Sequence, residues 1–217
     1  MSRTGSLRPW RRLGQGLRAL GHGLPGLALI ALAAFAFLPD ADAATGLTLE
    51  DQAFAGAARV GGVPLQLNGA GVRAAFIYKV YLAGLYLPAK AATGAEVLAE
   101  PGPKRLQLRL LMDGSADELA GALAGPLARR TSAASAPALR DRIAAFDRLL
   151  RGVGHVHKGD VVDLDFVPAV GLTLALNGRP VGAALPGADL CLALLDLFVG
   201  ERAADPRLKT GLLGAAS

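Results

Sequence analysis

Apolar and polar positions alternate along several stretches of this chain, in the manner of half-buried β-strands. The clearest case is residues 72–87, where Arg73 and Tyr81 share one parity within an otherwise apolar run. Asn68-Gly69, just before it, is typical of a tight turn. Ala83-Gly84 indicates a bulge or bend within the run, because glycine inside a strand often marks one.

Further periodic segments predict the rest of the order. Residues 48–67 are read as strand and loop, and three later segments predict strands at 105–112, 161–166 and 171–176. Asn177-Gly178 is typical of a hairpin turn.

Helical spacing and capping signals predict the helices. Ser115 followed by Glu118 has the spacing of a capping box, so a helix should begin there and run to about Arg130, with Pro126 as a point of kinking or interruption. Other helices are expected at 93–99, 136–150, 189–199 and 206–213. Strands, helices, strands and helices in this order predict an α+β domain, with a largely antiparallel sheet and helices gathered on one face.

The first 43 residues have the layout of a secretory signal peptide. Five arginines precede an apolar run at 24–38, and Ala41-Asp42-Ala43 provides a small-x-small cleavage pattern. The apolar run of about 15 residues is shorter than the roughly 20 that span a bilayer. We therefore expect a signal peptide at 1–43, one domain at 44–217, no membrane span after cleavage and export to a bacterial periplasm. An uncleaved N-terminal anchor and twin-arginine export, from Arg11-Arg12, are the alternatives.

Much of the chain's net positive charge lies in the predicted leader at 1–43. The leader holds five of the 23 basic residues and two of the 18 acidic ones, so the remaining chain has a net charge near +2. No aromatic residues interleave with a basic stripe, and nucleic acid is therefore not an expected partner.

Metal and nucleophile chemistry has little support. Cys191 lies in an apolar run and is interpreted as a small buried hydrophobe. His155 and His157 lack an obvious third ligand, and Asp163 and Asp165 alternate with apolar residues as the water-facing positions of a strand do. We predict no metal site and no cofactor.

Arg73 and Tyr81 remain as the candidate chemistry. A guanidinium and a phenol held over apolar surface suit a ligand with a negative head and an apolar body. The alternative is that Arg73 is a structural hydrogen-bond donor and Tyr81 an ordinary strand aromatic. If residues 73–81 formed one straight strand, the two side chains would be roughly 26 Å apart, too far to hold one carboxylate.

Two segments resemble the chalcone isomerase superfamily, and most closely its bacterial exported chalcone isomerase-like branch. They read Asn-Gly-Ala-Gly-Val-Arg at 68–73 and Lys-Val-Tyr-Leu-Ala-Gly-Leu-Tyr-Leu at 79–87. The resemblance implies an open-faced β-sandwich, in which a long antiparallel sheet is covered by helices on one side. In the plant isomerases it implies a substrate-binding role for the arginine that Arg73 matches. Those enzymes carry threonine where this chain has Tyr81, and their further tyrosine and asparagine find no counterpart at 113–125.

A second, non-catalytic branch of the superfamily binds fatty acids, and the resemblance gives Arg73 and Tyr81 the role of holding the carboxylate. The first hypothesis is therefore an exported, non-catalytic binder of a small apolar or amphipathic ligand such as a fatty acid. Arg73 and Tyr81 would hold its head, and Leu82, Leu108, Leu110 and the helix at 190–198 would line the pocket. The alternatives are an intramolecular lyase of the chalcone isomerase type, with Arg73 catalytic, and a periplasmic protein-interaction module.

Overall fold

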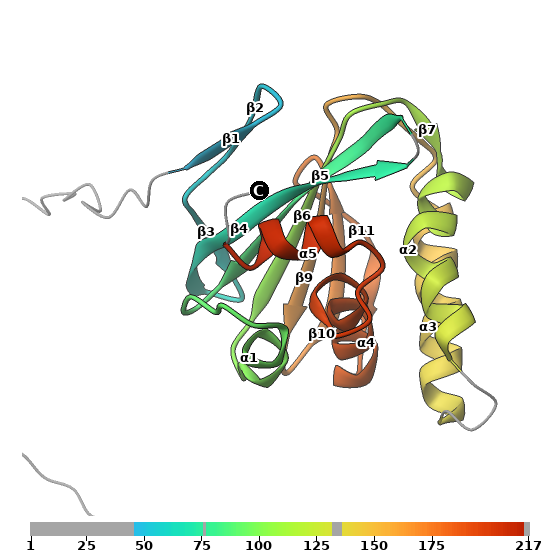
Figure 1. Cartoon of the computed structure of the whole chain (residues 1–217). Helices are drawn as coiled ribbons and strands as arrows, with labels where there is room; N and C mark the ends of the chain where they lie inside the picture. Colours follow the sequence, from blue (N-terminus) through green and yellow to red (C-terminus); the bar gives the residue numbers. More distant parts are fainter. Residues whose placement is uncertain (1–45, 76, 132–135, 215–217) are drawn as a thin grey trace, which may run out of the picture. The chain divides into compact units, whose positions relative to one another are not determined.

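A computed structural model describes residues 46–75, 77–131 and 136–214. The predicted signal peptide at 1–43 lies outside these residues. The described chain forms a seven-stranded antiparallel sheet in the order β11-β10-β9-β6-β5-β4-β3 (Figure 1). Its strands are β3 (Ala57–Val60), β4 (Val63–Ala75), β5 (Tyr78–Leu87), β6 (Lys104–Leu110), β9 (Val161–Val167), β10 (Gly171–Leu176) and β11 (Arg179–Leu185). Two short pairs accompany it, β1 (Leu47–Leu49) with β2 (Gln52–Phe54) and β7 (Gly114–Ser115) with β8 (His155–Val156).

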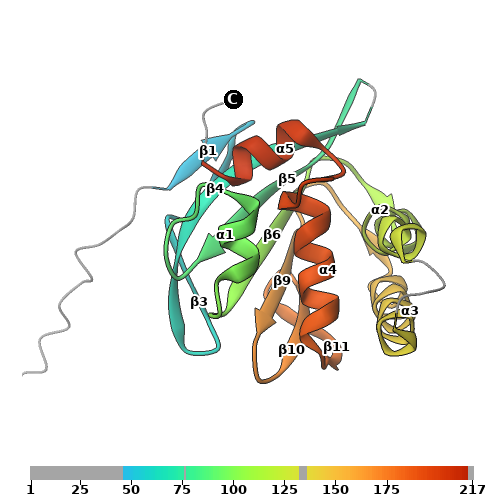
Figure 2. The same ribbon diagram turned by 60° about the horizontal axis from the view of Figure 1, so that its bottom comes forward.

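The helices gather on one face of this sheet, as the two views in Figures 1 and 2 show. They are α1 (Gly94–Ala99), α2 (Ala116–Arg130), α3 (Pro137–Arg151), α4 (Ala188–Val199) and α5 (Pro206–Leu212). Alternate residues of the central strands point to this side, and the main apolar core forms between them and the helices. The predicted α+β fold with helices on one face is therefore confirmed.

The opposite face carries a smaller apolar cluster and a polar network. Phe54, Leu82 and Tyr86 belong to the cluster. Beside it, the Arg105 guanidinium donates from Nε and Nη2 to the two carboxylate oxygens of Asp165, at 2.6 and 2.7 Å. Asp163 is only 8% exposed and accepts a hydrogen bond of 2.8 Å from Gln107 Nε2. The expectation that Asp163 faces water was wrong, because polar partners on the neighbouring strand allow its burial.

The largest correction concerns the turn. Asn68-Gly69 lies inside β4, at a shift in the β4–β5 register, and the chain reverses instead between Ala75 and Tyr78. The segment predicted as one strand at 72–87 therefore consists of the end of β4 and all of β5, joined as a hairpin. The predicted bulge at Ala83-Gly84 is absent from β5, whose pairing with β6 is regular there.

Alternate residues of β4 form the surface on which α5 lies. A Cβ on Gly69 would come within 2.2 Å of Gly211 O, so this position needs glycine for close approach; a Cβ on Gly71 would be tight, at 3.1 Å from Leu208 O. Asn68 is 5% exposed, and its amide donates to Ala91 O at 3.0 Å and Leu212 O at 2.8 Å. The glycine-rich motif is thus explained first as a docking surface for α5.

Most other elements fall where the sequence placed them. Thr93 and Ser115 both cap helices with complete capping boxes, and α2 continues through Pro126 to Arg130. Asn177 and Gly178 both have positive φ, as the predicted hairpin turn requires. None of the helices in the described ranges combines the length and apolar character needed to cross a bilayer.

Candidate functional site

The β4–β5 hairpin brings together the two predicted ligand-binding groups. Arg73 and Tyr81 are directly opposite in the register of this strand pair, so their side chains leave the same face of the sheet. Opposite residues in an antiparallel pair have Cα atoms roughly 4.5–5.5 Å apart. The separation of a straight strand, which would have excluded joint action, does not occur.

Arg73 already has an anionic partner from α5. Its Nη1 donates to Asp205 Oδ2 at 2.8 Å and to Ala74 O at 3.2 Å. Asp205 is also the N-cap of α5, because its Oδ1 accepts from the backbone N–H groups of Arg207 and Leu208 at 3.0 and 3.1 Å. Partial burial works to raise the pKa of Asp205, but these hydrogen bonds outweigh it and hold the pKa below its usual value.

Tyr81, opposite Arg73 in the β4–β5 register, is buried and lines a small cavity. It is 6% exposed, and burial raises the pKa of its hydroxyl well above the usual value, while the Arg73 charge opposes that rise. The hydroxyl therefore stays protonated and can donate a hydrogen bond. The cavity measures about 130 Å³ and lies between Tyr81, Leu110 and Leu119, the last on α2.

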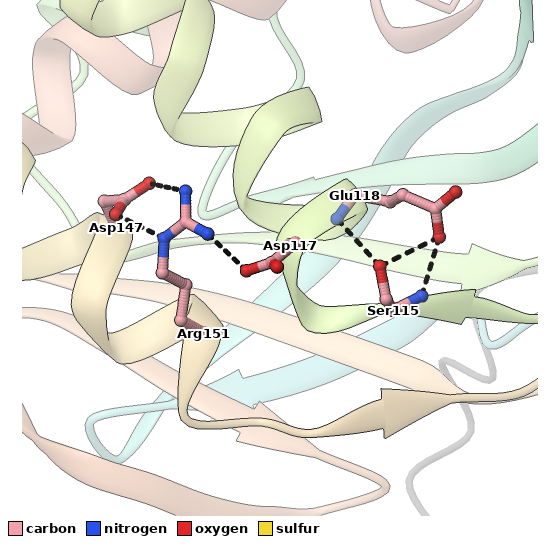
Figure 3. Close-up of polar contacts among 5 residues, drawn as sticks. All are labelled: Ser115, Asp117, Glu118, Asp147 and Arg151. Atoms are coloured by element: carbon pink, nitrogen blue, oxygen red, sulfur yellow. Dashed lines mark hydrogen bonds and ion pairs between the residues drawn. The ribbon is translucent and has the colours of Figure 1, made fainter.

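The rim of this cavity is acidic. Asp113, Ser115 and Glu118 line it beside the start of α2. Figure 3 shows the capping box, in which Glu118 Oε2 accepts from Ser115 N at 2.7 Å and from Ser115 Oγ at 3.0 Å. These bonds lower the pKa of Glu118, so it is ionised at neutral pH. Two carboxylates at the rim disfavour an anionic head there.

The neighbouring helix pair is tied together by an arginine. Arg151 of α3 donates to Asp117 of α2 and, within its own helix, to Asp147, with 2.7 Å from Nε to Oδ2 (Figure 3). A cavity of about 430 Å³ lies between α2 and α3, with Ala124 and Ile143 among its lining residues. It shares no lining residue with the Tyr81 cavity.

Comparison with known proteins decides the family. The sequence profile of a family described as chalcone isomerase-like matches residues 46–214. The chain belongs to this family. Among solved structures, a fatty-acid binding protein of Arabidopsis thaliana is similar, with a TM-score of 0.61 and 17% sequence identity over 78% of this chain and 96% of that one. Comparison with curated protein sequences found no significant match. The family resemblance is thus confirmed, and assignment to the bacterial exported branch stays a prediction.

The chalcone isomerase-like fold separates the predicted pocket residues into two groups. Leu108 and Leu110 lie on the helix-covered face with Tyr81, and Leu110 is opposite Tyr81 across β5–β6. Leu82 lies in the cluster on the other face, because one step along a strand reverses the side chain. Leu82 therefore does not line the Tyr81 cavity.

Two functional candidates were missed by sequence reasoning. Asp205 pairs with Arg73, and its only sequence signal is an aspartate before Pro206, which is typical of a helix N-cap. Lys104, at the start of β6, is buried without a carboxylate partner among the described residues, and no local sequence signal marks it.

Cys191 is buried, as predicted, and burial raises its thiol pKa to about 11. Within the described ranges, no three His, Cys, Asp or Glu side chains gather as a metal site would require.

Proposed function

We propose that this protein binds a small apolar or amphipathic ligand, of the fatty-acid type, without catalysing a reaction. The observation that carries the proposal is the register that sets Arg73 opposite Tyr81 on the helix-covered face. The fold is that of the chalcone isomerase-like family, and a structure with this fold belongs to a fatty-acid binding protein.

The hydrogen-bond geometry supports a ligand at this pair. Among the described residues, Arg73 uses only Nη1 in hydrogen bonds, so Nη2 and Nε remain for a carboxylate. The Tyr81 hydroxyl supplies one more donor. Hydrogen bonds to a charged group contribute roughly 1.5–3 kcal/mol each, and each buried methylene of an acyl chain adds about 0.8 kcal/mol.

Asp205 is the competitor that makes the proposal testable. A ligand carboxylate must share Arg73 with Asp205 or displace it. Delipidated protein should take up a fluorescent fatty acid, and Arg73→Ala should weaken uptake about tenfold or more. Asp205→Asn keeps a side-chain cap on α5 but removes the competing charge, so it should tighten binding. Tyr81→Phe should weaken binding by a smaller factor.

These variants separate a ligand role from a structural one. Asp205→Asn should lower stability in either case, but if Arg73 only anchors α5, the variant leaves fatty-acid affinity unchanged or weaker. Equal uptake by wild type and Arg73→Ala, with both proteins folded by circular dichroism, would remove Arg73 from the site.

A second candidate function has one observation in its favour. The Tyr81 cavity of about 130 Å³ is smaller than the roughly 300 Å³ at which pockets for drug-sized ligands, and so for long acyl chains, begin. A largely filled space beside Tyr81 is what a protein-interaction module would show. If the delipidated wild type takes up no fluorescent fatty acid, this second function is favoured. No observation on the described residues favours the isomerase alternative.

We also propose export, on the basis of the leader at 1–43. The protein recovered from the periplasm should begin at Ala44, give or take two residues, by intact mass. A full-length mass in the membrane fraction would instead indicate an uncleaved anchor.

A further inference from the structure

A third cavity lies between helices α1 and α4 and the ends of β6 and β9. Its volume is about 220 Å³, and its apolar lining includes Leu98, Phe166, Leu192 and Leu195. Figure 2 shows α1 and α4 on the same face of the sheet, where the two helices contact each other. None of its lining residues belongs to the Tyr81 cavity.

One cation, Lys104, and one acidic residue, Glu100, line this otherwise largely apolar cavity. Lys104 is 6% exposed, since its position in β6 points it toward the helices with Leu106 and Leu108. Its ammonium donates to Glu100 O and to Gly102 O, the latter at 3.0 Å. These carbonyls occupy two of its three N–H groups and lie at the end of α1, where a helix carries partial negative charge.

No carboxylate neutralises this ammonium in the described part of the chain. None of the ion pairs among the described residues involves Lys104. The acidic side chain nearest to it in sequence, that of Glu100, instead accepts a hydrogen bond from Gly102 N at 3.3 Å. Burial lowers the pKa of Lys104, while Glu100 opposes that shift from beyond ion-pair distance. A buried charge without a counterion is costly, so an anion that entered the cavity would offset part of that cost.

We propose that this cavity is a separate binding site for a small carboxylic acid, with the carboxylate on Lys104 and the apolar body against Phe166 and Leu195. The volume limits the ligand, because a cavity of about 150 Å³ already accepts benzene. An aromatic acid or a short-chain acid fits about 220 Å³, whereas long-chain fatty acids exceed it. This site differs from the Arg73–Tyr81 pair in its cation, its lining and the size of ligand it takes.

The single cysteine provides a reporter inside this site. Cys191 lines the cavity and is the chain's only thiol. Iodoacetate and iodoacetamide react with it in the same way: the thiolate sulfur attacks the CH₂ carbon, a C–S bond forms, and iodide leaves. Only iodoacetate carries a carboxylate, so the ratio of the two rates measures anion attraction at the cavity. The ratio cancels the thiolate fraction, which the high Cys191 pKa keeps low in both reactions.

The experiment uses the folded full-length chain at pH 9, with the rate ratio normalised to the urea-unfolded protein. Wild type should favour iodoacetate, and Lys104→Met should lower the ratio about tenfold. Lys104→Arg should retain most of it. Arg73→Met is the matched control and should leave it unchanged, which keeps this test distinct from that of the fatty-acid site.

Protection provides an independent measurement that needs no variant. Benzoate should slow the reaction of wild-type Cys191 with iodoacetamide, and benzamide, which has the same shape without the charge, should protect far less. Equal ratios in wild type and Lys104→Met, or equal protection by benzoate and benzamide, would overturn the proposal.

Discussion

Arg73 and Lys104 are two cations on the same face of one sheet, and their surroundings differ in burial and in the charge of their partners. Arg73 is half-exposed and pairs with Asp205, which also caps α5. Lys104 is buried, and the oxygens that it contacts are uncharged backbone carbonyls. The first cation has a carboxylate partner, whereas the second has none in the part of the chain that the structure describes.

This difference shows that a residue can match a family motif and still not be free to bind a ligand. An anionic ligand must compete with Asp205 for Arg73, whereas at Lys104 it would supply the missing charge. Arg73, which the sequence motif marks, therefore already has a carboxylate partner. Lys104, which no motif marks, has none among the described residues.

The largest expected effect comes from breaking the docking of α5 under Arg73. In Gly69→Ala the new Cβ would meet backbone atoms of α5 and its end, at 2.2 Å from Gly211 O and 2.7 Å from Gly214 N. Because backbone cannot move aside cheaply, we expect a loss of about 3 kcal/mol in the free energy of unfolding, measured by urea denaturation.

Gly121→Ala is the matched control for that substitution. A Cβ there meets nothing within 4 Å, and alanine is a better helix former than glycine, so a gain of up to about 1 kcal/mol is expected. The Cys191 rate ratio should survive Gly69→Ala if the Lys104 cavity is independent of α5. Similar stability of the two alanine variants would contradict the assigned role of Gly69.

A smaller effect is expected from Asp205→Asn, and it should depend on pH. The pKa of Asp205 is lowered in the folded protein, so its stabilisation is present above the unfolded value near 3.9 and is lost as pH falls through the folded value. Wild type should exceed the variant by about 1 kcal/mol at pH 7, or roughly 2–4 °C in Tm, and the difference should vanish in strong acid. A difference that persists at pH 2 would assign the effect to the cap rather than to the charge.

The smallest effect is expected at alkaline pH for Lys104→Met. Burial lowers the pKa of Lys104 in the folded state, so between that value and the unfolded value near 10.4 the unfolded chain binds more protons. Thermal melts should therefore show wild type gaining stability relative to the variant as pH rises toward 10. Saturating benzoate should flatten this trend, since it supplies the counterion. A flat trend without ligand would mean that Lys104 is already compensated.

The order of elements could be predicted because periodicity and capping are local signals. The Ser115 capping box, the β10–β11 turn at Asn177-Gly178 and the helices all lie close to their predicted places. The hairpin within 72–87 was missed, since Asn68-Gly69 carried the stronger turn signal and the true reversal between Ala75 and Tyr78 carried none. The glycines were needed for helix approach, and a single sequence does not distinguish that use from a turn.

The sequence by itself determined the two groups of the candidate site, the helix-covered sheet and the family, because side-chain chemistry and period are written along the chain. Tertiary structure alone decided which charges meet. Asp205 reaches Arg73 across 132 positions, and Lys104 loses its solvent only when α1 and α4 cover it. Counterions and burial are properties of the folded arrangement, so only the structure shows that Arg73 is paired with Asp205 and that Lys104 has no carboxylate partner among the described residues.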